Sequence, residues 1–289
     1  MANLKEIRVR ISSVHSTMQI TSAMKMVSAA KLKRAQDAIV QMRPYAEKLQ
    51  EILANVSGSL DASEGVYSQE RDVKNVLYVA ITSNRGLCGG FNNNVMKAIR
   101  RDIVDTNAKV SVLSLGKKAS DVFMKTDMHT TDGFGERPFE IWEDLTFDNV
   151  SIIANTIMKQ YTDGKWDKVV VVYNKFKNAA VQELKTEAFL PVVAQETEES
   201  NSSLEYIFEP NKASIVQEMI PKSLKVQLYK ALLDSRASEH GARMTAMHKA
   251  TDNASDIVKD LKLHYNKARQ AAITGEILEI VGGAEALNG

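Results

Sequence analysis

The stretch LDSRASEHGARMTAMHKATDNASDIVKDLKLHYNKARQAA, residues 233–272, repeats small or apolar residues at alternating steps of four and three. This spacing is typical of a helix that packs along one side against another helix. No proline occurs after Pro221, so the pattern predicts one helix from there to Leu287, on the order of 100 Å long at about 1.5 Å per residue. Such a helix must project beyond the domain to which it is attached. The repeating positions, which we call a seam, are Leu233, Ala237, His240, Met244, Met247, Thr251, Ala254, Val258, Leu261, Tyr265, Ala268 and Ala272.

A second seam lies at the other end of the chain. Its positions are Leu4, Ile7, Ile11, Val14, Met18, Thr21, Lys25, Ser28, Leu32, Ala35, Ile39, Met42, Ala46, Leu49, Leu53 and Val56. Two long seams separated by a compact middle can meet if the helices pack antiparallel. The sequence therefore predicts an intramolecular antiparallel coiled coil made by residues 1–57 and 210–287. Many seam positions are Ala, Ser or Thr and bury little apolar area, so we expect other chains to support its outer surface.

The middle of the chain changes period. Three apolar runs rich in β-branched residues, 73–83, 108–116 and 168–176, are typical of buried strands. Helical patterns cover 94–105, 117–125 and 148–161, and a last strand is expected at 180–189. Strands alternating with helices predict a parallel sheet in a central, Rossmann-like α/β domain spanning 72–205. The overall fold class is therefore α/β with a terminal coiled coil.

Composition fits a soluble protein of one or two domains. The 289 residues are 44% hydrophobic, and neither a membrane span nor a secretory signal is recognisable. A single cysteine, Cys88, excludes an intrachain disulfide. The net charge is only +1, yet the first 50 residues carry nine Lys or Arg against three acidic residues. A nucleic-acid-binding role for this basic helix is disfavoured, because aromatic residues are not interleaved with the charges.

The loop TSNRGLCGGFNNN after the first strand is the best candidate for a nucleotide site. Its glycines, Gly86, Gly89 and Gly90, do not fit GxGxxG, and GxxxxGK[ST] occurs nowhere in the chain. We interpret the loop as a tight strand-to-helix turn and Cys88 as a small buried thiol. No cofactor or catalytic set is predicted, and the five histidines have no metal-ligand spacing; His240, on the seam, is expected to be a hydrogen-bonded packing residue.

Four blocks of the sequence resemble the γ subunit of F-type ATP synthases. They are YNKARQAAITGEILEIVGGAEAL near the C-terminus, ITSAMKMVSAAKL near the N-terminus, the loop TSNRGLCGGFN, and EHGARMTAMHKATDNA. Asn84 departs from the family pattern, which usually has Asp at this place. The cysteine-bearing insertion of chloroplast γ subunits is lacking, so the resemblance is to the bacterial type.

The resemblance implies a central-stalk rotor subunit without an active site of its own. Its terminal helices would form an asymmetric shaft inside a ring of three α and three β subunits. The α/β domain would lie against the ε subunit and the ring of c subunits. One copy per complex would couple proton-driven rotation of the c ring to ATP synthesis or hydrolysis at the β subunits. The place implied is the cytoplasmic face of the bacterial inner membrane, as a peripheral protein.

The resemblance also implies partner-contact residues. Arg269 and Gln270 match a pair that bonds a loop of β in the family, Thr274 lies one to two turns beyond, and Lys25 matches a position that approaches an acidic loop of β. Glu239 and Arg243, four residues apart, are expected to pair with each other, with a contact to β as the alternative. The apolar residues expected to form a bearing tip inside the ring are Ile273, Ile277, Leu278, Ile280 and Val281.

Two other functions remain open from the sequence. A small α/β enzyme with a coiled-coil oligomerisation arm would bind a nucleotide in a manner that depends on Gly89. A nucleic-acid-binding coiled coil would bind duplex DNA with a steep salt dependence.

Overall fold

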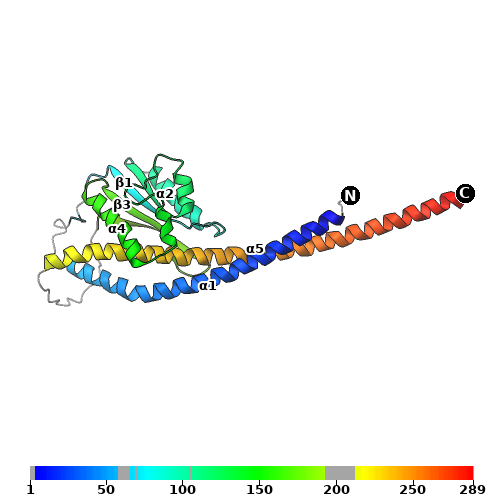
Figure 1. The fold of residues 1–289 in the computed structure, drawn as a ribbon, viewed down its shortest axis with the longest axis horizontal. Coiled ribbons are helices and arrows are strands. Elements are labelled where there is room, and N and C mark those ends of the chain that lie inside the picture. The colour runs from blue at the N-terminus through cyan, green and yellow to red at the C-terminus, as the bar shows by residue number, and fades with distance from the viewer. Residues whose placement is uncertain (1–3, 58–65, 69–70, 105, 193–211, 289) are drawn as a thin grey trace. The chain divides into compact units, whose positions relative to one another are not determined.

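The computed structural model describes residues 4–57, 66–68, 71–104, 106–192 and 212–288. It divides into two compact units. The helical unit comprises residues 1–28 and 244–289, and the α/β unit comprises residues 29–243. The elements, labelled in Figure 1, are α1 (Leu4–Ser57), β1 (Asn75–Ile81), α2 (Phe91–Val104), β2 (Lys109–Leu115), α3 (Lys117–Phe123), the 3-10 helix η1 (Pro138–Trp142), α4 (Phe147–Thr162), β3 (Lys168–Phe176), β4 (Gln182–Leu190) and α5 (Lys212–Asn288).

The sheet of the α/β unit has four strands in the order β2-β1-β3-β4. β1 pairs in parallel with β2 and β3, as predicted, but β4 runs antiparallel to β3. The sheet is therefore mixed, because the last strand, for which the sequence predicted no direction, joins it antiparallel. The reason is the short connection at 177–181, because five residues can close a hairpin but cannot make the crossover that a parallel pair needs.

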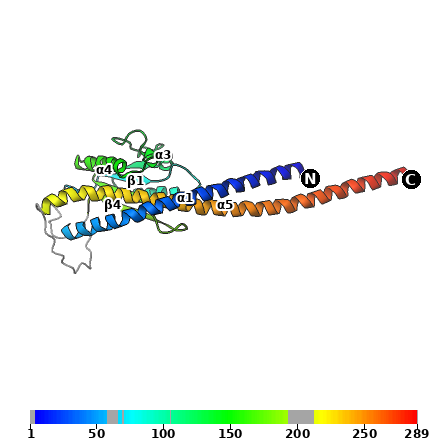
Figure 2. The ribbon, with the colours of Figure 1, turned by 60° about the horizontal axis from the view of Figure 1, so that its bottom comes forward.

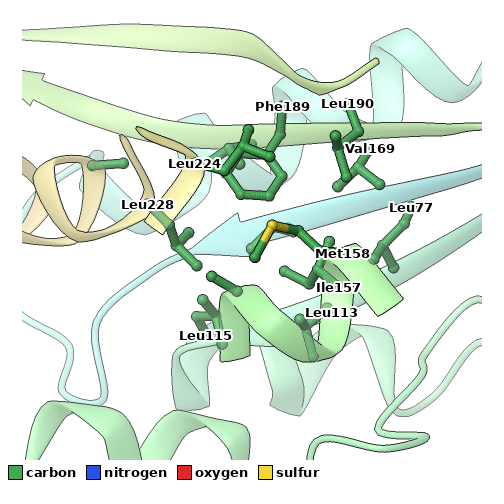
Figure 3. Close-up of a cluster of buried hydrophobic side chains, with 14 of the residues drawn as sticks. Leu77, Leu113, Leu115, Ile157, Met158, Val169, Phe189, Leu190, Leu224 and Leu228 are labelled. Carbon is green, nitrogen blue, oxygen red and sulfur yellow. The ribbon is translucent and has the colours of Figure 1, made fainter. Parts of the chain in front are cut away.

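Both faces of the sheet are covered. On one face, α2 and α3 pack against the strands through residues such as Ile99 and Phe123. On the other face, α4 is joined by α5, which inserts Leu224 and Leu228 into the same core as Leu77 of β1 (Figure 3). Since α5 provides part of this core, the compact unit extends beyond the central segment predicted from periodicity.

The two terminal helices lie side by side within each unit (Figures 1 and 2). In the α/β unit, Ala46 and Leu49 of α1 form a small buried cluster with Val226 of α5. α1 continues through Pro44, and α5 already begins at Lys212 and continues through Pro221. Among the described residues, none of the helices is both long and apolar enough to span a bilayer.

Candidate functional site

The predicted seam of the helical unit faces inward. Every predicted position of α1 from Leu4 to Ser28, and of α5 from Met244 to Ala272, is buried or half-buried, whereas most residues between them are exposed. Lys25 follows this pattern and is half-buried, although it is charged. The burial pattern therefore confirms the period read from the sequence.

Side-chain hydrogen bonds join the helices at two places in the described part of this unit. Near the start of α1, the Arg8 guanidinium donates to the Tyr265 hydroxyl at 2.8 Å and lies 5.8 Å from the ring centre. Further along, the hydroxyls of Thr21 and Thr251 are 2.8 Å apart. Together the two contacts show that the helices are antiparallel, as the sequence predicted, because the later residue of α1 contacts the earlier residue of α5.

The residues predicted to form the bearing tip lie beyond the paired part of α5. All five side chains are exposed, with Ile280 71% exposed. Over residues 276–286 every position is exposed, so apolar and polar side chains alike face away from the rest of the unit. Exposed apolar surfaces of this kind are typical of interaction sites, and the role of this helix end stays a prediction. The tip residues are Ile273, Ile277, Leu278, Ile280 and Val281.

The predicted partner-contact residues of the helical unit are also accessible. Arg269, Gln270 and Thr274 are exposed, and their side chains make no hydrogen bond or ion pair with the described residues. Lys25 likewise has no ion-pair partner in the described part of the chain. Their donors are available to a neighbour, and their assignment to the β subunit stays a prediction.

Glu239 and Arg243 form a buried ion pair in the α/β unit, as their spacing predicted. An Arg243 nitrogen lies 2.6 Å from a Glu239 carboxylate oxygen, and the two side chains are only 9% and 12% exposed. Arg243 also donates to the backbone carbonyls of Arg85 and Gly86, at 2.9 Å and 3.2 Å. This second set of contacts was not predicted. It ties α5 to the loop that follows β1.

The surroundings of this pair are electrostatically unusual. Burial raises the pKa of Glu239, and the nearby cations of Arg243, Arg236 and Lys31 oppose the rise. Burial and the same cations lower the pKa of His240 to about 4. His240 is therefore neutral at physiological pH, in agreement with its predicted role as a buried packing residue. One of its ring nitrogens lies 3.5 Å from Arg243.

The loop at 82–90 is the turn that the sequence predicted, and its residues are fixed from several sides. The Asn92 side chain accepts from the Ser83 backbone N–H at 2.9 Å, and Cys88 is buried among these groups. Burial raises the pKa of the Cys88 thiol. Leu87 is held at φ +62° with its side chain exposed. A non-glycine residue keeps this conformation only where its surroundings determine it.

Two backbone carbonyls of the loop are engaged by α5. In open α/β sheets, ligands bind beyond the carboxyl ends of the strands, where a phosphate needs backbone N–H groups. Here the carbonyls of Arg85 and Gly86 point at the Arg243 guanidinium. Nearby, Gly241 of α5 approaches the chain beyond β3 so closely that an added Cβ would lie 3.2 Å from Ala179 Cα. α5 therefore contacts the segments that follow β1 and β3.

Asn84 connects three segments through its amide. Its nitrogen donates to the Phe139 carbonyl of η1 at 3.0 Å, and its oxygen accepts from the Lys117 backbone N–H, at the start of α3, at 2.9 Å. An aspartate could accept the second bond but could not donate the first. Asn84 is therefore suited to this contact with η1, which the sequence alone did not reveal.

We expect Asn84→Asp to lower the free energy of unfolding of the α/β unit by about 1–3 kcal/mol, because a carboxylate oxygen would face the Phe139 carbonyl. Urea unfolding followed by the fluorescence of Trp142 and Trp166 measures this, since both tryptophans belong to the unit. Asn93→Asp, on the exposed side of α2, is the matched control and should change little. An unchanged midpoint for Asn84→Asp would contradict the importance of this bond.

Comparisons with known proteins agree with these features. A family model described as ATP synthase matches residues 3–287. The ATP synthase γ chain of Flavobacterium johnsoniae is 60% identical over 291 residues, and that of Christiangramia forsetii is 59% identical over 293; both alignments cover all of each chain.

Solved structures agree in fold. A chain of the Euglena gracilis mitochondrial ATP synthase assembly of OSCP, F1 and c-ring superposes with a TM-score of 0.69 at 22% identity, covering 98% of this chain and 94% of the other. A chain of the central stalk and c-ring structure from Tetrahymena thermophila gives a TM-score of 0.57 at 24% identity, covering 80% and 99%. The fold, the sequence identity and the full-length match agree, and the chain therefore belongs to the γ-chain family of the ATP synthases.

Proposed function

We propose that the chain is the central-stalk rotor of an F-type ATP synthase and has no active site of its own. The observation that carries the proposal is the end of α5, where five large apolar side chains are exposed beyond the paired seam. A helix that is apolar on several sides needs an enclosing protein surface. A ring of three α and three β subunits would provide one, with Ile273, Ile277, Leu278, Ile280 and Val281 as the bearing tip.

The coupling follows from differential contacts. A shaft whose sides differ meets each of three equivalent β subunits with a different face, and so favours a different conformation in each. Arg269, Gln270 and Thr274, together with Lys25, are the side chains we propose to contact β. Rotation moves each contact to the next subunit, which couples turning of the c ring to ATP synthesis or hydrolysis.

The remaining partners and the location belong to the same proposal. The α/β unit would bind the ε subunit and the c ring, which would hold the chain at the cytoplasmic face of the bacterial inner membrane as a peripheral subunit. The bacterial relatives support this placement. The first role of Glu239 and Arg243 would be within the chain, where they fix the loop after β1 to α5. A contact with β is the alternative role.

The proposal is tested by assembly. The chain is co-expressed with α and β subunits from the same source, and the purified complex is weighed by native mass spectrometry. We expect three α, three β and one copy of this chain, and ATP hydrolysis by the complex but not by the chain alone. A chain that stays outside the ring, or that hydrolyses ATP by itself, would overturn the proposal.

We expect replacement of Arg269 and Gln270 together by Ala to lower ATP synthesis in energised vesicles roughly tenfold, because hydrogen bonds to a charged group contribute about 1.5–3 kcal/mol. The α/β unit should unfold at an unchanged urea concentration, since both side chains are exposed in the helical unit. Replacing Asn266 and Lys267, exposed one turn earlier, by Ala is the control. Equal losses in both variants would refute a specific role for the pair.

A further inference from the structure

The hydroxyl pair of Thr21 and Thr251 lies in the seam of the helical unit. Their Oγ1 atoms are 2.8 Å apart, and Thr21 is only 8% exposed. Each hydroxyl also lies within hydrogen-bonding distance of a carbonyl of its own helix, Met18 at 3.0 Å for Thr21 and Met247 at 2.8 Å for Thr251. Two protons serve three contacts, so one threonine donates across the seam while the other donates to its own helix.

The apolar part of this seam selects a register only weakly. The buried residues of the helical unit are two hydroxyl residues, one alanine and two larger side chains: Thr21, Ser28, Ala254, Met247 and Val258. Small or apolar residues fill nearly every seam position of both helices, so a slip of seven residues would again place small or apolar residues opposite one another. Polar residues at single seam positions are known to specify register at some cost in stability.

We propose that the Thr21–Thr251 hydroxyl pair is a register lock, which sets how far α1 is shifted along α5 in the helical unit. With Thr21 opposite Thr251, each seven-residue step along α1 matches one step back along α5. Val14 then faces Val258, and Lys25 faces Met247. The Arg8–Tyr265 bond fits the same register, one residue from the position where Ile7 faces Tyr265.

A slip in either direction breaks the lock. Moving the helices by seven residues places Thr21 opposite either Val258 or Met244, neither of which can return a hydroxyl hydrogen bond. The same slip moves Lys25 to a new partner position on α5. The lock therefore fixes the position of Lys25, and of the exposed side chains around it, along α5.

The test uses the full chain with Cys88→Ser and three engineered cysteine pairs. Val14→Cys with Val258→Cys reports the register described above. Ile7→Cys with Val258→Cys and Ile11→Cys with Ala268→Cys report slips of seven residues in the two directions. Disulfide yields are measured for each pair with Thr21 and Thr251 intact, with both changed to Val, and with both changed to Ser.

With both threonines intact, we expect a high disulfide yield for the first cysteine pair and almost none for the other two. Changing both to Val should raise the ratio of slipped to unslipped cross-links roughly fivefold, the change expected from one net hydrogen bond. Changing both to Ser should restore the original ratio. Thermal stability should stay equal or rise in the double Val variant. Replacing both threonines by an apolar residue leaves neither hydroxyl buried without its hydrogen-bond partner.

Four results would overturn the lock. One is an unchanged cross-link ratio in the double Val variant. Another is an equal shift with Thr17→Val, an exposed threonine of α1 that bonds only its own helix, to the Ser13 carbonyl at 3.1 Å. The third is a shift in the double Ser variant as large as in the double Val variant. If the valine variant loses helicity instead, the threonines act by stability rather than register, and the proposal fails.

Discussion

Arg243→Ala lowers the free energy of unfolding of the α/β unit by about 3–5 kcal/mol, the cost of breaking one side of a buried ion pair. The variant leaves the Glu239 carboxylate without its closest cation, and it leaves the carbonyls of Arg85 and Gly86 without their side-chain donor. Urea unfolding followed by tryptophan fluorescence measures the loss. A change below about 1 kcal/mol would show that the cluster does not hold the loop to α5.

The same variant has a characteristic pH dependence. Arg243 opposes the rise of the Glu239 pKa, so its removal raises that pKa further. A carboxyl whose pKa is higher in the folded protein than in the unfolded chain favours folding below that pKa, and this contribution is lost as the pH rises through it. The penalty in Arg243→Ala should therefore be larger at about pH 8 than at about pH 5.5. Arg137→Ala, which removes an exposed ion pair with Glu140 in the same unit, is the control and should cost about 0–1 kcal/mol at either pH.

Gly116→Ala is expected to destabilise the α/β unit by about 3 kcal/mol or to prevent its folding. Gly116 follows β2, and an added Cβ would meet the backbone oxygen and the side-chain oxygen of Thr82 well inside van der Waals contact. The backbone cannot move away cheaply, because the Thr82 hydroxyl accepts from the Ala119 N–H at the start of α3. The measurement is the urea midpoint, or the soluble yield if the chain does not fold.

Gly86→Ala provides the matched control for Gly116→Ala. An added Cβ there would meet nothing closer than the end of the Lys118 side chain, at 3.9 Å. We expect a change within about 1 kcal/mol. If the two alanine variants were equally stable, the close approach of Thr82 would not be the reason why position 116 requires glycine.

The helices were the most predictable part of the fold. A seam with a strict period leaves a signal at every third or fourth residue, and tertiary packing only reinforces it. Thus Thr21 and Thr251 were placed on their seams from spacing alone, and both face inward. The run at 168–176 was likewise recognised as a strand with its observed bounds, because β-branched residues fill a strand buried on both faces.

Contacts between distant segments were not predictable. The period of β4 does not reveal its direction, which is set by the length of the turn before it. Arg243 gave a local signal for Glu239, four residues away, but none for the carbonyls of Arg85 and Gly86, because backbone acceptors leave no trace in a sequence. For the same reason the double role of the Asn84 amide became apparent only from its neighbours. The predicted contacts of Arg269 and Gln270 with β involve another chain and stay predictions.

The insertion of α5 into the core of the α/β unit has a consequence for biosynthesis. Leu77 is made early, whereas Leu224 and Leu228, which share its core, leave the ribosome only after most of the chain has been translated. Until then one apolar face of the sheet lacks part of its cover. The α/β unit therefore completes its folding late, together with the C-terminal helix, and the nascent chain must keep an incomplete core from aggregating during much of its synthesis.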